Sequence, residues 1–305
     1  MSLLEFMELY GSEEQCIQAL FKQRWPEGFR CPRCSGDQAY RVSTAGRPLF
    51  QCHACRFQAS LTTGTLMQDT KLALRKWFLA IYLISQAKTG ISSLALKRQL
   101  GVDYRTAWLL HHKLLLAMAE QDSLTPLRGD VQMDDAYLGG ELPGVPGRGS
   151  PNKVPIVAAV SLDGQQRPLR VKLAPLAGFT RDAVADWAKL NLAPGCDVRS
   201  DGLACFAGVI DAQCAHSFIV VGARKPRDLP QFTCVNTVLG NLKTMINGAH
   251  KAFDFAKYAA RYLGAFAYRF NRRLDLHSLV SRLLAHAVTA APRTEKIVRG
   301  AELGH

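Results

Sequence analysis

The segment that decides the fold reads VQMDDAYLGG and covers residues 131–140. It is rich in strand-forming residues, carries two adjacent carboxylates, Asp134 and Asp135, and stops at a glycine pair. Because neighbouring side chains of a strand point to opposite faces, we expect only one of these carboxylates to face a given pocket. A site for a divalent metal therefore needs another carboxylate from elsewhere in the chain.

That carboxylate is predicted to be Asp201. It ends a strand-like run that begins at Cys196, and the following Gly202 allows a sharp turn. Acidic residues at strand ends also cap turns, and for any single aspartate at a strand end this role is commoner than metal binding. Two such strand ends in a basic chain favour a metal site that contains Asp134 and Asp201.

The composition is that of a folded protein with a polyanionic partner. Of the 305 residues, 48% are hydrophobic and 21% charged, yet the formal net charge is +13 and the pI about 9.5. This excess favours nucleic acid ahead of a membrane surface. No apolar run approaches the roughly 20 residues that span a bilayer, and the N-terminus lacks the basic start of a secretory signal. We therefore expect a cytoplasmic protein associated with the nucleoid.

Two CxxC pairs predict a structural zinc site. Seventeen residues separate Cys31 and Cys34 from Cys52 and Cys55, which is the spacing of a zinc ribbon. Four thiolates make a closed tetrahedral shell that leaves no position for catalysis. A redox-active pair is the weaker alternative, because such pairs usually occur singly. His53 either replaces a cysteine as ligand or faces solvent or DNA.

Residues 71–120 change to a helical period, and the segment 65–124 is predicted to form a helix-turn-helix domain. A cap at Asp103 starts the second helix of this motif after a short turn at residues 101–103. The side chains that this helix would offer to a DNA groove are Tyr104, Arg105, His112 and Lys113. A helical hairpin that only packs is the alternative.

Strand and helix patterns alternate from residue 127 to about 222. Strands are predicted at residues 131–138, 155–162, 168–174, 196–200 and 216–221, and helices at 180–192 and 203–212. The order of three strands, then helix, strand, helix and strand predicts an α/β fold, with a mixed sheet flanked by helices.

Other basic residues are candidates for phosphate contacts. Arg148 and Lys153 lie in a glycine-rich segment that is either a flap over a nucleic-acid backbone or a plain hairpin loop. Arg269, Arg272 and Arg273 alternate with aromatic residues near the end of a helix, and either bind phosphate or only solvate its face. The segment 277–305 is predicted to hold a helix end and a loose tail.

The order of these motifs resembles bacterial insertion-sequence transposases of the DDE type that carry an N-terminal zinc ribbon. The resemblance runs from about residue 5 to 276 and rests on the zinc ribbon, the helix-turn-helix and the motifs MDDAYLGG, SDG, VNTVLGNLK and YRFNRR. It implies a ribonuclease-H-like catalytic fold in which Asp134 and Asp201 are the first two catalytic carboxylates. The predicted domains are residues 1–64 (helix and zinc ribbon), 65–124 (helix-turn-helix), 125–276 (catalytic) and 277–305.

The third catalytic position departs from the DDE pattern. The resemblance implies a glutamate on a late helix and a lysine about seven residues later, on the same helix face. Counting back from Lys243 gives Asn236, which offers a carbonyl oxygen but no charge. Asn241 is the alternative, although it would point about 200° away from the lysine on a regular helix. The resemblance includes branches that carry asparagine here.

The resemblance implies a transposase that binds the terminal inverted repeats of an insertion sequence and then cleaves and joins DNA strands. The implied cofactors are a structural Zn²⁺ in the ribbon and two catalytic Mg²⁺ held by Asp134, Asp201 and Asn236, with Lys243 near a phosphate. The implied partners are element ends, target DNA and further copies of the chain in a synaptic complex. The alternative is a non-catalytic DNA-binding regulator, or a decayed transposase that has lost its chemistry with the glutamate.

Overall fold

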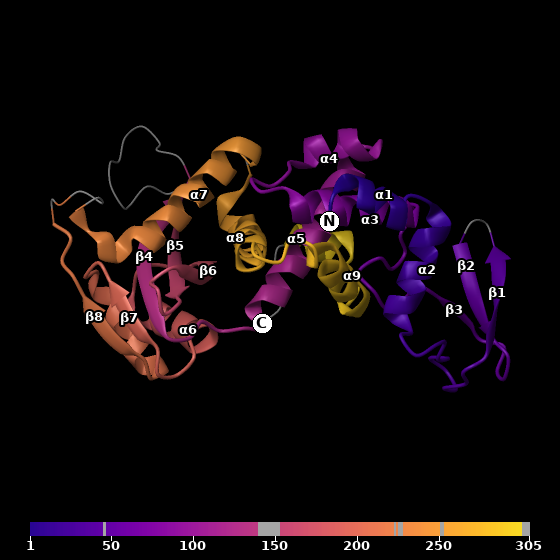
Figure 1. The fold of residues 1–305 in the computed structure, drawn as a ribbon, viewed down its shortest axis with the longest axis horizontal. Helices are drawn as coiled ribbons and strands as arrows, with labels where there is room; N and C mark the ends of the chain where they lie inside the picture. Colours follow the sequence, from indigo (N-terminus) through magenta and orange to yellow (C-terminus); the bar gives the residue numbers. More distant parts are fainter. Residues whose placement is uncertain (45–46, 140–152, 223, 225–227, 251–252, 301–305) are drawn as a thin grey trace. The chain divides into compact units, whose positions relative to one another are not determined.

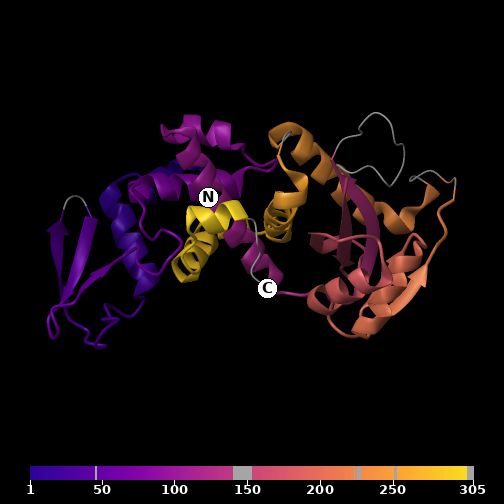
Figure 2. The same ribbon diagram turned by 180° about the vertical axis from the view of Figure 1, so that it is seen from behind.

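The computed structural model describes residues 1–44, 47–139, 153–222, 224, 228–250 and 253–300 (Figures 1 and 2). The chain divides into two compact units. The first comprises residues 1–87, 91–117 and 275–305, and the second comprises residues 88–90 and 118–274. Among the described helices, none combines the length and the apolar character that crossing a membrane requires.

The first unit begins with two helices and a small antiparallel sheet. The helices are α1 (Leu3–Tyr10) and α2 (Glu13–Arg24), and the strands, in sheet order, are β1 (Ala39–Thr44), β2 (Arg47–Cys52) and β3 (Gln58–Ser60). Aromatic packing joins α2 to the sheet, since the ring of Phe50 lies 4.9 Å from that of Phe21 and 5.6 Å from that of Trp25. The predicted ribbon is thus attached to the helix that precedes it.

The predicted helix-turn-helix is present as α4 (Ser93–Leu100) and α5 (Tyr104–Ser123), after α3 (Leu74–Gln86). Gly101 ends α4 with a φ of +59°, a conformation that favours glycine. As predicted, Asp103 caps α5, because its Oδ1 accepts the Thr106 N–H at 2.9 Å. Beyond its first turn α5 is a core helix, with side chains such as Leu110 and Leu114 buried.

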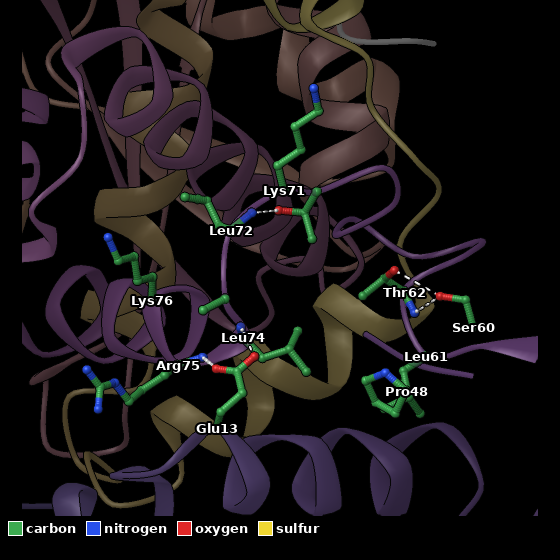
Figure 3. Close-up of a pocket in the computed structure, with 12 residues that line it drawn as sticks. Glu13, Pro48, Ser60, Leu61, Thr62, Lys71, Leu72, Leu74, Arg75 and Lys76 are labelled. Carbon is green, nitrogen blue, oxygen red and sulfur yellow. Dashed lines mark hydrogen bonds between the residues drawn. The ribbon is translucent and has the colours of Figure 1, made fainter. Parts of the chain in front are cut away.

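The start of α3 is capped from α2. The Glu13 carboxylate accepts the N–H groups of Leu74 at 2.7 Å and Arg75 at 2.9 Å, as the dashed lines in Figure 3 show. A negative charge is favourable there, because it meets unpaired N–H groups and the positive end of the helix dipole. A cavity of about 490 Å³ adjoins this cap, and Lys71 and Lys76 are among its lining residues (Figure 3).

The prediction of a loose tail was wrong for the described residues up to 300. Residues 279–300 contain α9 (Leu279–Thr289) and α10 (Glu295–Gly300). Leu283 and Leu284 of α9 are buried, α9 packs on α3 in the same unit, and Val298 of α10 is fully buried. Because α10 has few apolar residues, its sequence shows no clear period, and its burial depends on contacts with distant segments.

The second unit is built on one five-stranded sheet. Its strands are β4 (Asp130–Leu138), β5 (Val154–Leu162), β6 (Pro168–Pro175), β7 (Asp197–Ser200) and β8 (Ala215–Phe218). They lie in the order β6-β5-β4-β7-β8, with β6, β5 and β4 antiparallel and the pairs β4–β7 and β7–β8 parallel. This is the predicted ribonuclease-H-like mixed sheet, although its last strand ends at Phe218 and not at residue 221.

Helices cover both faces of the sheet, so alternate residues of β5 belong to different core layers. Ala158 and Val160 pack on one face with α7 (Thr233–Ala249) and α8 (Phe255–Asn271). Val157 and Ala159 pack on the other face with α6 (Arg181–Asn191) and the 3₁₀ helix η1 (Ala204–Ala212). A strand buried on both faces reads as a continuous apolar run, as β5 does.

Candidate active site

Strands β4 and β7 bring Asp134 and Asp201 to the same edge of the sheet. The strands are parallel, and their last paired residues are Gln132 and Arg199. Each aspartate lies two residues beyond this pair, and Gly202, with a φ of +91°, turns the chain after Asp201 as predicted. The two carboxylates therefore lie just past the point where β4 and β7 stop pairing, although β4 itself continues to Leu138.

Asp135 is closer to this pair than strand alternation alone predicts. One ligand oxygen each from Asp134, Asp135 and Asp201 lie within 4.8 Å of one another. A small cavity of about 140 Å³ is lined by Asp134 and Asp201 and not by Asp135, which agrees with the expected opposite directions of the two neighbours. Asp135 thus adds negative charge beside the cavity without lining it.

Asn236 of α7 lines the same cavity as the two aspartates, together with apolar residues that include Phe232. Asn241 is exposed and is not among the lining residues described. The start of α7 is held on β4 by a buried contact, because Gln132 Oε1 accepts the Val235 N–H at 3.1 Å. The sequence reasoning missed Gln132, although a polar residue within an apolar strand is a signal for such an anchor.

The neighbouring carboxylates affect the protonation of Asp134. The pKa of the Asp134 carboxyl is raised to about 7, first by its burial and then by the charges of Asp201 and Asp135. The Asp135 N–H and the positive charge of Lys243 oppose this rise. A divalent cation would relieve the repulsion and displace the proton. Oxygen donors crowded in this way fit a hard cation such as Mg²⁺.

The four cysteines of the ribbon also form one cluster. The sulfur atoms of Cys31 and Cys55 are 3.6 Å apart, as are those of Cys34 and Cys52, and all four lie within 4.8 Å of one another. A disulfide needs about 2.05 Å, whereas Zn–S bonds of about 2.3 Å place tetrahedral sulfurs roughly 3.8 Å apart. The cluster fits a zinc ion and excludes disulfides between these cysteines in this conformation.

Two known domain families match the chain. Residues 126–271 match the ISXO2-like transposase domain, and residues 11–58 match the transposase zinc-ribbon domain. Both matches are to transposase domains, so they support the predicted resemblance to transposases that carry a zinc ribbon. The transposase domain covers all five strands of the large sheet together with Asp134, Asp201 and Asn236.

Two individual proteins resemble the chain at low sequence identity. The "Uncharacterized protein in transposable element ISH50" of Halobacterium salinarum is 30% identical over 142 residues, which are 45% of this chain and 46% of that relative. The chain thus spans about half the length of this relative. A crystal structure of a pre-cleavage Mos1 transpososome matches 67% of this chain and 75% of that chain, at 12% identity and a TM-score of 0.24. The fold assignment rests on the strand order, because this score is too low to support it.

The predicted helix-turn-helix exposes fewer of the predicted DNA-binding residues than expected. Tyr104 is 51% exposed and the Arg105 side chain 72% exposed at the start of α5. His112 and Lys113 are buried, and Lys113 Nζ donates to the Leu66 carbonyl, so the prediction that these two residues contact DNA was wrong. The apolar stripe marks one buried face of α5, but every residue from 110 to 118 is buried, so burial is not limited to that face.

Arg105 already has a partner within the first unit. Its Nε and Nη2 atoms donate to the Glu295 carboxylate of α10 at 2.7–3.2 Å, and Glu295 also accepts from Arg299 Nε at 2.7 Å. Arg299 lies over the Trp108 ring, 4.7 Å from its centroid. A segment predicted to be loose therefore contacts the first two turns of α5.

The arginines near the end of α8 are structural in this conformation. Arg269 is buried and its Nη2 lies 3.2 Å from the Met245 sulfur, so the prediction that it contacts DNA was wrong. Arg272 Nη1 donates to the buried carboxylate of Asp122 at 3.2 Å, and Arg273 donates to the carbonyls of Pro168 and Leu169. These contacts tie the end of α8 to α5 and β6.

The predicted flap falls mostly outside the described residues. Arg148 lies within residues 140–152, which are outside them. Lys153 directly precedes β5 and is partly exposed, so it remains a candidate for a phosphate contact.

Proposed function

We propose that the chain is a transposase that binds the ends of its insertion sequence and cleaves and joins DNA strands in a metal-dependent reaction. One observation carries this proposal: Asp134 and Asp201, just past the last paired residues of the parallel strands β4 and β7, share a cavity with Asn236. The match of residues 126–271 to a transposase domain supports it, as does the net charge of +13.

Asp134, Asp201 and Asn236 would hold the divalent ions. When bound, such ions activate a water or a DNA 3′-hydroxyl for attack and stabilise charge on the phosphodiester. Asn236 contributes an oxygen without charge, and Asp135, within 4.8 Å of the pair, supplies the third negative charge of the cluster. Lys243 lies two turns after Asn236 on the exposed side of α7, where it would bind a phosphate of the DNA.

The second candidate function is DNA binding without catalysis. The observation that favours it is the neutral Asn236 in the cavity, since loss of a charged ligand weakens metal binding. The carboxylate of Asp135 beside the pair favours the catalytic function instead.

Cleavage by the purified chain separates the two functions. The substrate is a plasmid carrying the inverted repeats that flank the coding sequence, and the control plasmid carries shuffled repeats. The proposal expects nicks with 3′-hydroxyl ends at the repeats in Mg²⁺ or Mn²⁺ and none in chelator. Binding to the repeats without nicking under either metal would favour the regulator.

The zinc ribbon and the first turn of α5 would recognise the element ends. In this proposal the exposed Arg105 contacts DNA once its ion pair with Glu295 opens. Hydrogen bonds from Arg105 and Arg299 hold the pKa of the Glu295 carboxyl well below its normal value, at about 2. The carboxylate therefore competes with a DNA phosphate for the same guanidinium.

Glu295→Gln is expected to tighten binding to DNA by about two- to fivefold, because it removes the carboxylate that competes with DNA for Arg105. The effect is small because an exposed ion pair is weak. Arg105→Ala should instead reduce the discrimination between element ends and random DNA. Fluorescence anisotropy at fixed salt measures both effects. Asp186→Asn is the matched control, because it makes the same charge change at the exposed pair with Lys189. If the control gained as much affinity for DNA as Glu295→Gln, the competition between Glu295 and DNA for Arg105 would be contradicted.

A further inference from the structure

A second cavity lies further along β4 from the acidic site. Its volume is about 340 Å³, and β4, β5, α7 and the start of α8 form its walls. Ala136 lies on the same face of β4 as Asp134, about 7 Å further along the strand. Lys243 lines this cavity, and its charge acts on Asp134. The cavity therefore begins about one nucleotide away from the carboxylates.

The lining of this cavity combines an apolar floor with a polar rim. Ile156, Leu242 and Ile246 are buried and form the floor, and the partly buried Phe255 adds an aromatic side chain. Lys243 and Asn247 are exposed, and they lie on one face of α7 because they are four residues apart.

This combination suits an unpaired nucleobase. The flat body of a base packs on apolar and aromatic side chains, its edge accepts and donates hydrogen bonds as an asparagine amide does, and its phosphate attracts a lysine. The volume is within the range of small-molecule sites, and a cavity of this size holds one base and not a base pair.

We propose that this cavity, the base slot, binds a nucleobase unstacked from the DNA strand whose phosphate lies at Asp134 and Asp201. The inference rests on the proposed function and adds to it a contact with a single base. Phe255 stacks on the base, Asn247 bonds its edge and Lys243 holds the adjoining phosphate. Enzymes that extrude a base lose its stacking in the duplex, and a slot of this kind offsets that loss.

A double-mutant cycle between protein and DNA tests the base slot. One partner is Phe255→Leu, which keeps apolar packing but removes stacking, and the other is an abasic site placed in turn at each of the three nucleotides on either side of the cleavage point. If no cleavage is found, the positions are counted from the edge of the DNA segment that the bound protein protects in a footprinting experiment. The cost of extrusion is common to both proteins at each position and cancels in the cycle.

At one position, removing the base should weaken binding by wild type about tenfold more than binding by Phe255→Leu, and Phe255→Tyr should restore the wild-type value. Thr244→Ala, an exposed change on α7 outside the cavity lining described, should leave the coupling unchanged.

Absence of coupling at every position overturns the base slot even if the DNA is cleaved. A change in oligomeric state on Phe255→Leu without coupling would assign the cavity to a second copy of the chain and also overturn it. Position-specific coupling without cleavage supports the slot and counts against the proposed reaction.

Discussion

Asp201→Asn is expected to reduce DNA cleavage and strand joining by about a thousandfold or more while leaving end binding unchanged. The substitution keeps the shape of the side chain and removes one of the two carboxylates that line the small cavity. Binding should persist because the zinc ribbon, α4 and the first part of α5, up to residue 117, belong to the other compact unit. Single-turnover cleavage and anisotropy on the same DNA measure the two effects.

Asp197→Asn is the matched control for this prediction. Asp197 begins the same strand, β7, and is exposed, so its loss changes the net charge equally without touching the cavity. Cleavage by Asp197→Asn should be close to wild type. If both variants lost activity alike, the effect would come from β7 as a whole and not from a metal ligand.

Removal of zinc is expected to unfold the ribbon and to abolish preference for element ends. Residues 11–58 are too few to bury a stable core, so metal binding should supply most of their folding free energy, about 10–16 kcal/mol in small zinc domains. Cys34→Ser should have the same effect as chelation. Metal analysis, with hydrogen exchange of residues 11–58, provides the measurement.

Cys234→Ser serves as the control, because Cys234 lies on α7 and outside the four-sulfur cluster. It should retain one zinc per chain and a protected ribbon. Slow exchange in residues 11–58 after the metal has been removed would show that packing of Phe50 on Phe21 and Trp25 suffices without zinc.

Much of the fold was predictable because its signals are local. The strands of the large sheet are short runs rich in strand-forming residues, and glycines such as Gly202 mark turns that follow them. The zinc cluster follows from cysteine spacing alone. The seven-residue interval between Asn236 and Lys243 also predicted which asparagine would line the cavity with the aspartates.

The remaining features depend on contacts between residues far apart in sequence. Glu295 lies 190 residues after Arg105, and no local pattern indicates that they pair. His112 looked available because the apolar stripe accounts for one face of α5, whereas other segments bury the rest. The arginines of α8 illustrate the same limit, since Arg272 finds its partner, Asp122, 150 residues away. A basic residue in a DNA-binding protein is thus not automatically a DNA contact.

The central claim is that Asp134, Asp201 and Asn236 form one metal site. The most direct test compares single-turnover cleavage by Asn236→Ala and Asn241→Ala in Mg²⁺ and in Mn²⁺. These are the same substitution on the same helix, but only Asn236 is among the described residues that line the acidic cavity. The account predicts that Asn236→Ala loses cleavage as Asp201→Asn does, whereas Asn241→Ala cleaves like wild type. Loss of cleavage in Asn241→Ala with Asn236→Ala unaffected, or no cleavage by wild type with either metal, would contradict it.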